Sequence, residues 1–145
     1  MLGSNWEKLR DKIVGVDSEL TFFFTNDKLK GVMVEPWDEW TSEPYDTRHA
    51  RTDLEGSFYD WYNSLSKRYG TGALFDGDER MGVKADFKSL QTKLSLVFSD
   101  DRSFHVGFTP SERTVVELHA GYVKESRLKG HHVSILFTEI VADNF

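Results

Sequence analysis

An apolar stripe in the middle of the chain most constrains the fold. Five large side chains recur at i, i+3, i+4, i+7 and i+11 of a helix: Phe58, Trp61, Tyr62, Leu65 and Tyr69. Gly70 follows directly, at the position where a glycine commonly ends a helix. This spacing predicts an amphipathic helix whose aromatic face belongs to the core, because one continuous stripe of this size needs a broad apolar surface to cover it.

Strands are expected on both sides of this helix. Residues 19–25 and 29–35 are rich in β-branched and aromatic residues, and the turn-forming sequence Asn26-Asp27-Lys28 joins them, so they predict a hairpin. Five further strands are expected in the second half, near 83–87, 93–99, 103–109, 114–123 and 131–141.

A second, shorter helix is predicted at the N-terminus. Ser4 and Glu7 have the spacing of a capping box, and Trp6, Leu9 and Ile13 follow at i, i+3 and i+7 up to Gly15. Together these elements predict a single compact α+β domain over residues 1–145, as its length also favours. We expect a mostly antiparallel sheet of about six to seven strands, open or partly closed into a barrel, packed against two α-helices.

Two stretches of the chain resemble each other. Residues 19–36 and 93–110 align without gaps over eighteen residues and share Leu, Phe, Asp, Val and Pro at five positions. Either an ancient duplication of a hairpin or the common demands of strands and turns accounts for this pattern.

The hydrophobic pattern also predicts a strand register. Apolar residues share one face of the sheet if residues 104, 106 and 108 pair with residues 120, 118 and 116 of the following strand. The same face continues through residues 133, 135 and 137 of the last strand. On the other side it continues through residues 98, 96 and 94, which pair with 104, 106 and 108. His105 and His119 are then directly opposed on the other face, with Glu117 diagonally away. Such a pair can bind a metal, respond to pH or remain a solvated surface pair.

Composition excludes several classes of function. The chain has no cysteine, which rules out disulfide scaffolds, cysteine-ligated metals and cysteine nucleophiles. Its formal net charge of −6 argues against nucleic-acid binding driven by overall charge. Its apolar runs fall far short of the ~20 residues of a membrane span. We therefore expect a cytoplasmic protein, and since nucleotide-binding and metalloprotease motifs are missing, we assign no cofactor, metal or catalytic residue.

Residues 35–46 carry the most informative local signal for function. The stretch holds five acidic residues, no basic residue and three large aromatics. Aromatic side chains anchor interfaces, and carboxylates steer a basic partner. The predicted partner-binding residues are Trp37, Asp38, Glu39, Trp40, Glu43, Tyr45 and Asp46. The alternatives are that the two tryptophans plug one end of the sheet, or that two of the carboxylates act in glycoside hydrolysis.

This profile of a small, acidic, cysteine-free chain resembles that of bacterial immunity proteins. The resemblance implies an inhibitor that caps a basic protein, such as a nuclease-type toxin domain. The resemblance concerns size and composition only, and no sequence motif carries it.

Two other readings remain open. A small-ligand-binding protein or hydrolase would have a pocket between sheet and aromatic helix; the groups to watch are Tyr62, Tyr69, His105, His119 and His132. The sequence His132-Val133-Ser134-Ile135 resembles one half of the paired signature of two-histidine phosphoesterases, but the other candidate half, His105-Val106-Gly107-Phe108, lacks the hydroxyl. Alternatively, the aromatic segment is buried against a second copy of the chain.

Overall fold

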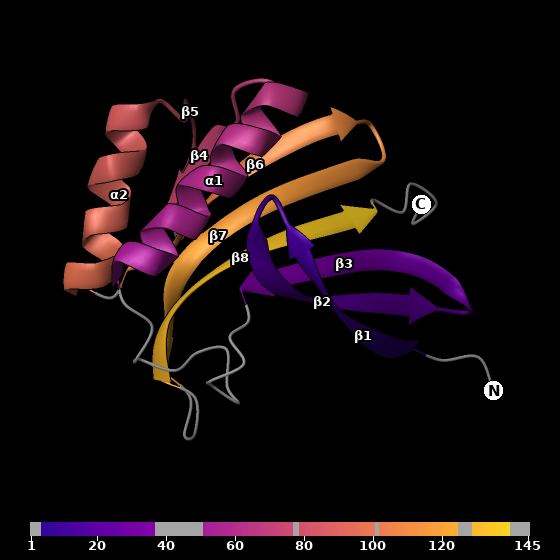
Figure 1. Ribbon diagram of the computed structural model, residues 1–145. Coiled ribbons are helices and arrows are strands. Elements are labelled where there is room, and N and C mark those ends of the chain that lie inside the picture. Colours follow the sequence, from indigo (N-terminus) through magenta and orange to yellow (C-terminus); the bar gives the residue numbers. More distant parts are fainter. Residues whose placement is uncertain (1–3, 37–50, 77–78, 101, 125–128, 140–145) are drawn as a thin grey trace.

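A computed structural model describes residues 4–36, 51–76, 79–100, 102–124 and 129–139 (Figure 1). It contains eight strands and two helices in chain order: β1 (Ser4–Ile13), β2 (Val16–Thr25), β3 (Lys28–Pro36), α1 (Arg51–Tyr69), β4 (Ala73–Asp76), β5 (Glu79–Lys84), α2 (Phe87–Asp100), β6 (Phe104–Ser111), β7 (Thr114–Lys124) and β8 (Lys129–Glu139).

All eight strands form one sheet in the order β1-β2-β3-β8-β7-β6-β4-β5, and each pair of neighbours is antiparallel. Both helices lie on the same side of this sheet (Figure 1). The predicted α+β class with a mostly antiparallel sheet against two helices is therefore confirmed. The sheet is open and is not closed into a barrel.

The predicted central helix and much of the register are confirmed. The stripe from Phe58 to Tyr69 lies within α1. The first predicted hairpin is β2–β3, closed by Asn26 and Asp27, whose φ values of 52° and 63° suit a two-residue hairpin turn. Phe104 pairs with Ala120, and the register continues as predicted through β7 to β8.

The prediction of a helix over residues 4–15 is wrong, because this segment is the edge strand β1. Val14 and Gly15 adopt φ values of 50° and 77° and turn the chain back, so that Ile13 pairs with Val16. Ten residues of β1 then pair with β2 without a bulge. The capping sequence is a weak local preference, and pairing along the whole of the strongly β-forming β2 outweighs it.

The prediction of a strand over residues 93–99 is also wrong, because these residues belong to α2. Leu90, Leu94 and Val97 are buried at helical spacing, and Asp86 caps the helix by accepting a hydrogen bond from the Ser89 N–H at 2.8 Å. The strand expected over 83–87 is instead the end of β5 followed by this cap. Residues 98, 96 and 94 therefore do not pair with β6.

The two similar stretches have different structures as a result. Residues 19–36 form most of the β2–β3 hairpin, whereas residues 93–110 cover the end of α2 and most of β6. Their resemblance is one of residue pattern and not a structural repeat.

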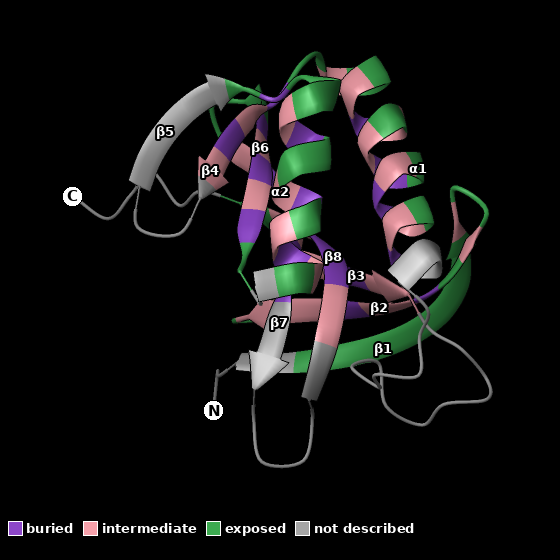
Figure 2. Cartoon of the chain, turned by 90° about the vertical axis from the view of Figure 1, so that its left-hand side faces the viewer, coloured by how far each residue is buried: buried purple, intermediate pink, exposed green. Residues whose placement is uncertain are grey.

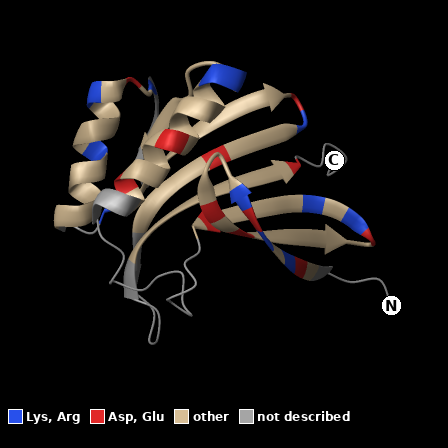
Figure 3. Cartoon of the chain, viewed as in Figure 1, with Lys and Arg blue, Asp and Glu red and all other residues tan. Residues whose placement is uncertain are grey.

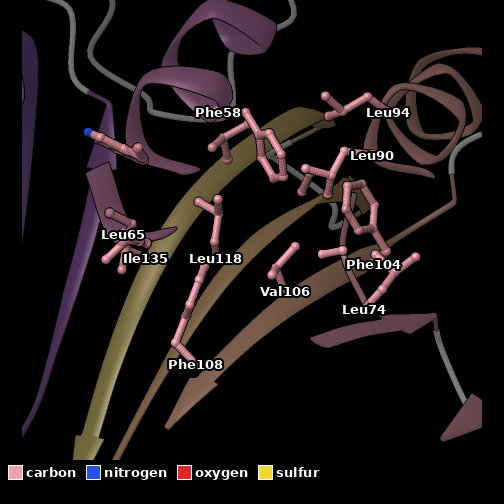
Figure 4. Packing of buried hydrophobic residues seen from close by; sticks show 14 of the residues in the cluster. Phe58, Leu65, Leu74, Leu90, Leu94, Phe104, Val106, Phe108, Leu118 and Ile135 are labelled. Carbon is pink, nitrogen blue, oxygen red and sulfur yellow. The ribbon is translucent and has the colours of Figure 1, made fainter. Parts of the chain in front are cut away.

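The core lies between the helices and the sheet (Figures 2 and 4). Phe58 and Trp61 of α1 are fully buried, and the Phe58 ring packs 5.5 Å from that of Phe104 on β6. The Trp61 Nε1–H donates to the Ile13 carbonyl oxygen at 3.1 Å, which ties α1 to the β1–β2 turn. The aromatic stripe is thus core, as predicted.

Candidate functional site

The seven predicted partner-binding residues lie outside the described residues: Trp37, Asp38, Glu39, Trp40, Glu43, Tyr45 and Asp46. The structure describes the two elements that flank them. Val34 near the end of β3 and Leu54 near the start of α1 are both buried in the core. Residues 37–50, which contain most of the acidic segment, therefore connect two elements that are anchored in the core.

The predicted opposition of two histidines is confirmed. His105 on β6 faces His119 on β7, and the centroids of their rings lie 4.9 Å apart. The row continues on both sides, because Phe75 of β4 pairs with His105 and Ser134 of β8 pairs with His119. Since Phe104 and Val106, the neighbours of His105, point to the core, this row lies on the sheet face away from the helices.

Glu117 joins the two imidazoles more closely than the register alone predicts. Its Oε2 lies 3.2 Å from the His105 Nε2, and its Oε1 lies 3.7 Å from the His119 Nε2. The residue opposite Glu117 on β6 is Gly107, and the Phe75 ring lies over this glycine, where an added Cβ would come within 3.1 Å of it. The Phe75 ring stacks on the His105 ring at a centroid distance of 5.0 Å. It covers the side of His105 that faces away from His119, because β4 and β7 flank β6 on opposite sides.

Burial lowers the pKa of His119, and the neighbouring His105 acts in the same direction, while the Glu117 carboxylate opposes the shift. Burial also lowers the pKa of His132 to about 4, with smaller contributions from His119 and His131. One carboxylate can neutralise only one imidazolium, so a second proton in this cluster meets an uncompensated positive charge. For His119 and His132, the lowered pKa favours the neutral imidazole at pH 7.

The residues of the predicted pocket do not come together. Tyr62 and Tyr69 lie on the helix side, with their rings 6.3 and 6.4 Å from that of Phe108. Tyr62 also donates a hydrogen bond to the Ala85 carbonyl oxygen. The three histidines lie on the opposite face of the sheet, so the tyrosines and histidines do not line one cavity.

His132 and Ser134 share this outer face of β8, since Val133 between them is buried in the core. His105 lies on the same face two strands away, with β7 between. Within the described part of the chain, no three His, Asp or Glu residues are arranged to hold a metal ion. In the same residues, no helix is long and apolar enough to cross a membrane.

Comparison with known proteins adds no family. No family model matches the chain, and neither do curated proteins or solved structures at a significant level. Any functional argument therefore rests on the residues themselves.

Sequence reasoning missed Phe75, because no strand was expected between the aromatic helix and residue 83, where β4 and the first part of β5 lie. The sequence signal for β4 was the short apolar run Ala73-Leu74-Phe75, which follows Gly72 and precedes Asp76-Gly77. Sequence reasoning also left Glu117 outside the histidine pair, since the direction in which its side chain extends toward His105 and His119 is decided by the tertiary arrangement.

Proposed function

We propose that this protein is a cytoplasmic binding protein, an inhibitor whose acidic aromatic segment at residues 35–46 caps a basic protein partner. The observation that carries the proposal is the concentration of charge. The chain has a formal net charge of −6, and this segment alone contributes −5, so the other 133 residues together carry −1. Almost all of the excess negative charge therefore lies in one short stretch of the sequence.

The segment also holds the residues that make strong contacts. Trp37, Trp40 and Tyr45 have the large amphipathic rings that dominate binding energies at interfaces. The four carboxylates between and beside them would attract a basic partner before contact and orient it. A nuclease-type toxin domain, basic because it binds nucleic acid, is the partner class that best fits this chemistry.

The anchored ends support the same function. Val34 and Leu54 are 2% and 5% exposed, so the segment connects two elements that are packed into the core. A binding segment held at both ends loses less conformational freedom on association than a free tail does.

The first experiment identifies the partner and tests the location together. The tagged protein is used to capture partners from source-cell lysate at low and high salt, and retained proteins are identified by mass spectrometry. Asp38→Lys with Glu39→Lys is expected to reduce the association rate of a captured basic partner about tenfold or more, because electrostatic steering is lost. Stopped-flow or surface-based kinetics would measure this change.

The matched control reverses two acidic residues elsewhere, Asp60→Lys with Glu112→Lys, which are exposed on α1 and on the β6–β7 turn. Both pairs change the net charge equally, so an effect of overall charge would appear in both. An unchanged rate for the Asp38 and Glu39 variant, or equal losses in the two variants, would exclude residues 35–46 as the binding surface.

A hydrolase or small-ligand-binding protein is the second candidate, favoured by the partly exposed cluster of His105, Glu117 and His119. Such a site would lie on the outer face of the sheet and not under the aromatic helix. Hydrolysis of a generic phosphodiester or glycoside that is lost in His119→Ala but kept in Tyr69→Phe would favour it over the binding protein.

A further inference from the structure

In the part of the chain that the structure describes, the outer edge of the sheet at β1 is free to pair with a further strand. β1 is ten residues long, comes first in the strand order and pairs only with β2 within the described residues. All side chains from residue 6 to residue 12 are exposed, including Trp6 at 61% and Leu9 at 54% (Figure 2). A long edge without a bulge is a template on which another extended chain can add.

The turn at Val14 and Gly15 decides which backbone groups point outward. In a two-residue hairpin the pair that flanks the turn, here Ile13 and Val16, exchanges both hydrogen bonds, and such pairs then alternate along the ladder. Every second residue of β1, including Trp6, Lys8 and Lys12, therefore directs its N–H and C=O away from β2. The Lys12 N–H agrees with this assignment, because it donates to the Asp11 carboxylate at 2.7 Å and not to β2.

Charged residues of both signs follow one another along β1 (Figure 3), and the two signs lie on opposite faces of the strand. Lys8, Arg10 and Lys12 share one face, whereas Glu7 and Asp11 lie on the other, with Leu9 between them. Lys8 and Lys12 already contact Glu19 and Asp17 of β2, at 2.9 and 3.7 Å. Their side chains are still more than half exposed and can meet a further carboxylate from the outer side.

This pattern disfavours a second copy of β1 as the occupant. Two copies related by a two-fold axis pair antiparallel about one central residue. If Glu7, Lys8, Arg10 or Asp11 is central, that residue faces its own copy, which opposes like charges. If Leu9 is central, Glu7 faces Asp11 and Lys8 faces Arg10. Directly opposed like charges destabilise a strand pair, so each of these registers is penalised. A two-fold centred on Trp6 opposes no like charges, but it pairs only residues 4–8, half of β1.

We infer that β1 is a docking edge for an extended segment of a different protein, added antiparallel to β1. The segment would carry acidic residues opposite Lys8, Arg10 and Lys12, basic residues opposite Glu7 and Asp11, and an apolar residue opposite Leu9. Backbone hydrogen bonds would supply affinity, and the alternating charges would select partner and register. β1 shares no residue with the proposed acidic segment at residues 35–46, and either proposal can fail without the other.

Two synthetic heptapeptides test the inference on the full chain. The matched probe is Glu-Lys-Glu-Val-Glu-Lys-Val, and the inverted probe, with every charge reversed, is Lys-Glu-Lys-Val-Lys-Glu-Val. The matched probe is expected to shift the backbone amide resonances of Trp6, Lys8 and Lys12 in the NMR spectrum of the labelled protein. It should bind about tenfold or more tightly than the inverted probe, because five opposed charge pairs change sign between them.

Variants separate pairing at this edge from general charge effects. Lys8→Glu with Arg10→Glu should shift the preference toward the inverted probe, while Lys67→Glu with Arg68→Glu, the same change of net charge at the end of α1, should preserve it. If the first variant fails to fold, Glu7→Lys with Asp11→Lys tests the other face and should likewise weaken the matched probe. Equal binding of the two probes would overturn the inference, and so would peptide-induced resonance shifts that lie outside β1. Resonance shifts in β1 that depend on protein concentration without peptide would indicate a second copy of the chain and would also overturn it.

Discussion

Replacing Trp61 with alanine is expected to lower the free energy of unfolding by about 4 kcal/mol. Trp61 is fully buried, and its removal leaves a large cavity between α1 and the sheet. It also breaks the hydrogen bond to the Ile13 carbonyl oxygen. Urea denaturation followed by circular dichroism would measure the loss without relying on tryptophan fluorescence.

Two further substitutions serve as controls for this prediction. Trp6→Ala removes the same side chain from the exposed edge strand, where it is 61% accessible, and should cost less than about 1 kcal/mol. Trp61→Phe keeps most of the apolar volume and should give an intermediate loss. Equal destabilisation by Trp61→Ala and Trp6→Ala would show that α1 does not pack against the sheet as described.

Acidification from pH 7 to pH 5 is expected to destabilise the fold by on the order of 2 kcal/mol through His132 alone. The pKa of this imidazole is lowered by burial to about 4 in the folded protein, whereas a histidine in the unfolded chain titrates near its ordinary value of 6.5. Between these values the unfolded state binds more protons than the folded state. The loss of stability is therefore small above about pH 6.5, grows as the pH falls, and is complete near pH 4.

His119 should add to this effect, since burial lowers its pKa in the same direction. Urea denaturation at several pH values would give the slope, and His132→Gln should reduce it between pH 7 and pH 5. Recovery of the signal on return to pH 7 controls for irreversible loss. An imidazole resonance of His132 that titrates near pH 6.5, or an unchanged slope in the variant, would contradict the prediction.

Elements with a strong internal pattern could be predicted from the chain alone. Helix α1 has five large side chains at one spacing, and the strands β6, β7 and β8 alternate strictly enough to give their register. The opposition of His105 and His119 follows from that register without further information. Such patterns are decisive because a slip by one residue would expose every core side chain on the strand.

Segments with competing local signals were predicted incorrectly. Residues 4–13 combine a capping sequence with only three apolar residues, and their pairing with β2 is visible only when the turn at Val14 and Gly15 is known. Residues 87–100 contain both a strand-like run at 94–98 and a helical spacing of Leu90, Leu94 and Val97. The cap at Asp86 and the space beside α1 favour the helix.

By itself, therefore, the sequence determined the α+β class, the aromatic helix, the central register and the position of the acidic segment. Each depends on periodicity or composition, which are properties of residues close together in the chain. Only the tertiary structure decided that β1 is an edge strand, that Glu117 contacts two imidazoles and that the tyrosines and histidines lie on opposite faces. These features depend on which distant segments become neighbours, and the free energy that selects those neighbours comes from packing the whole sheet against both helices.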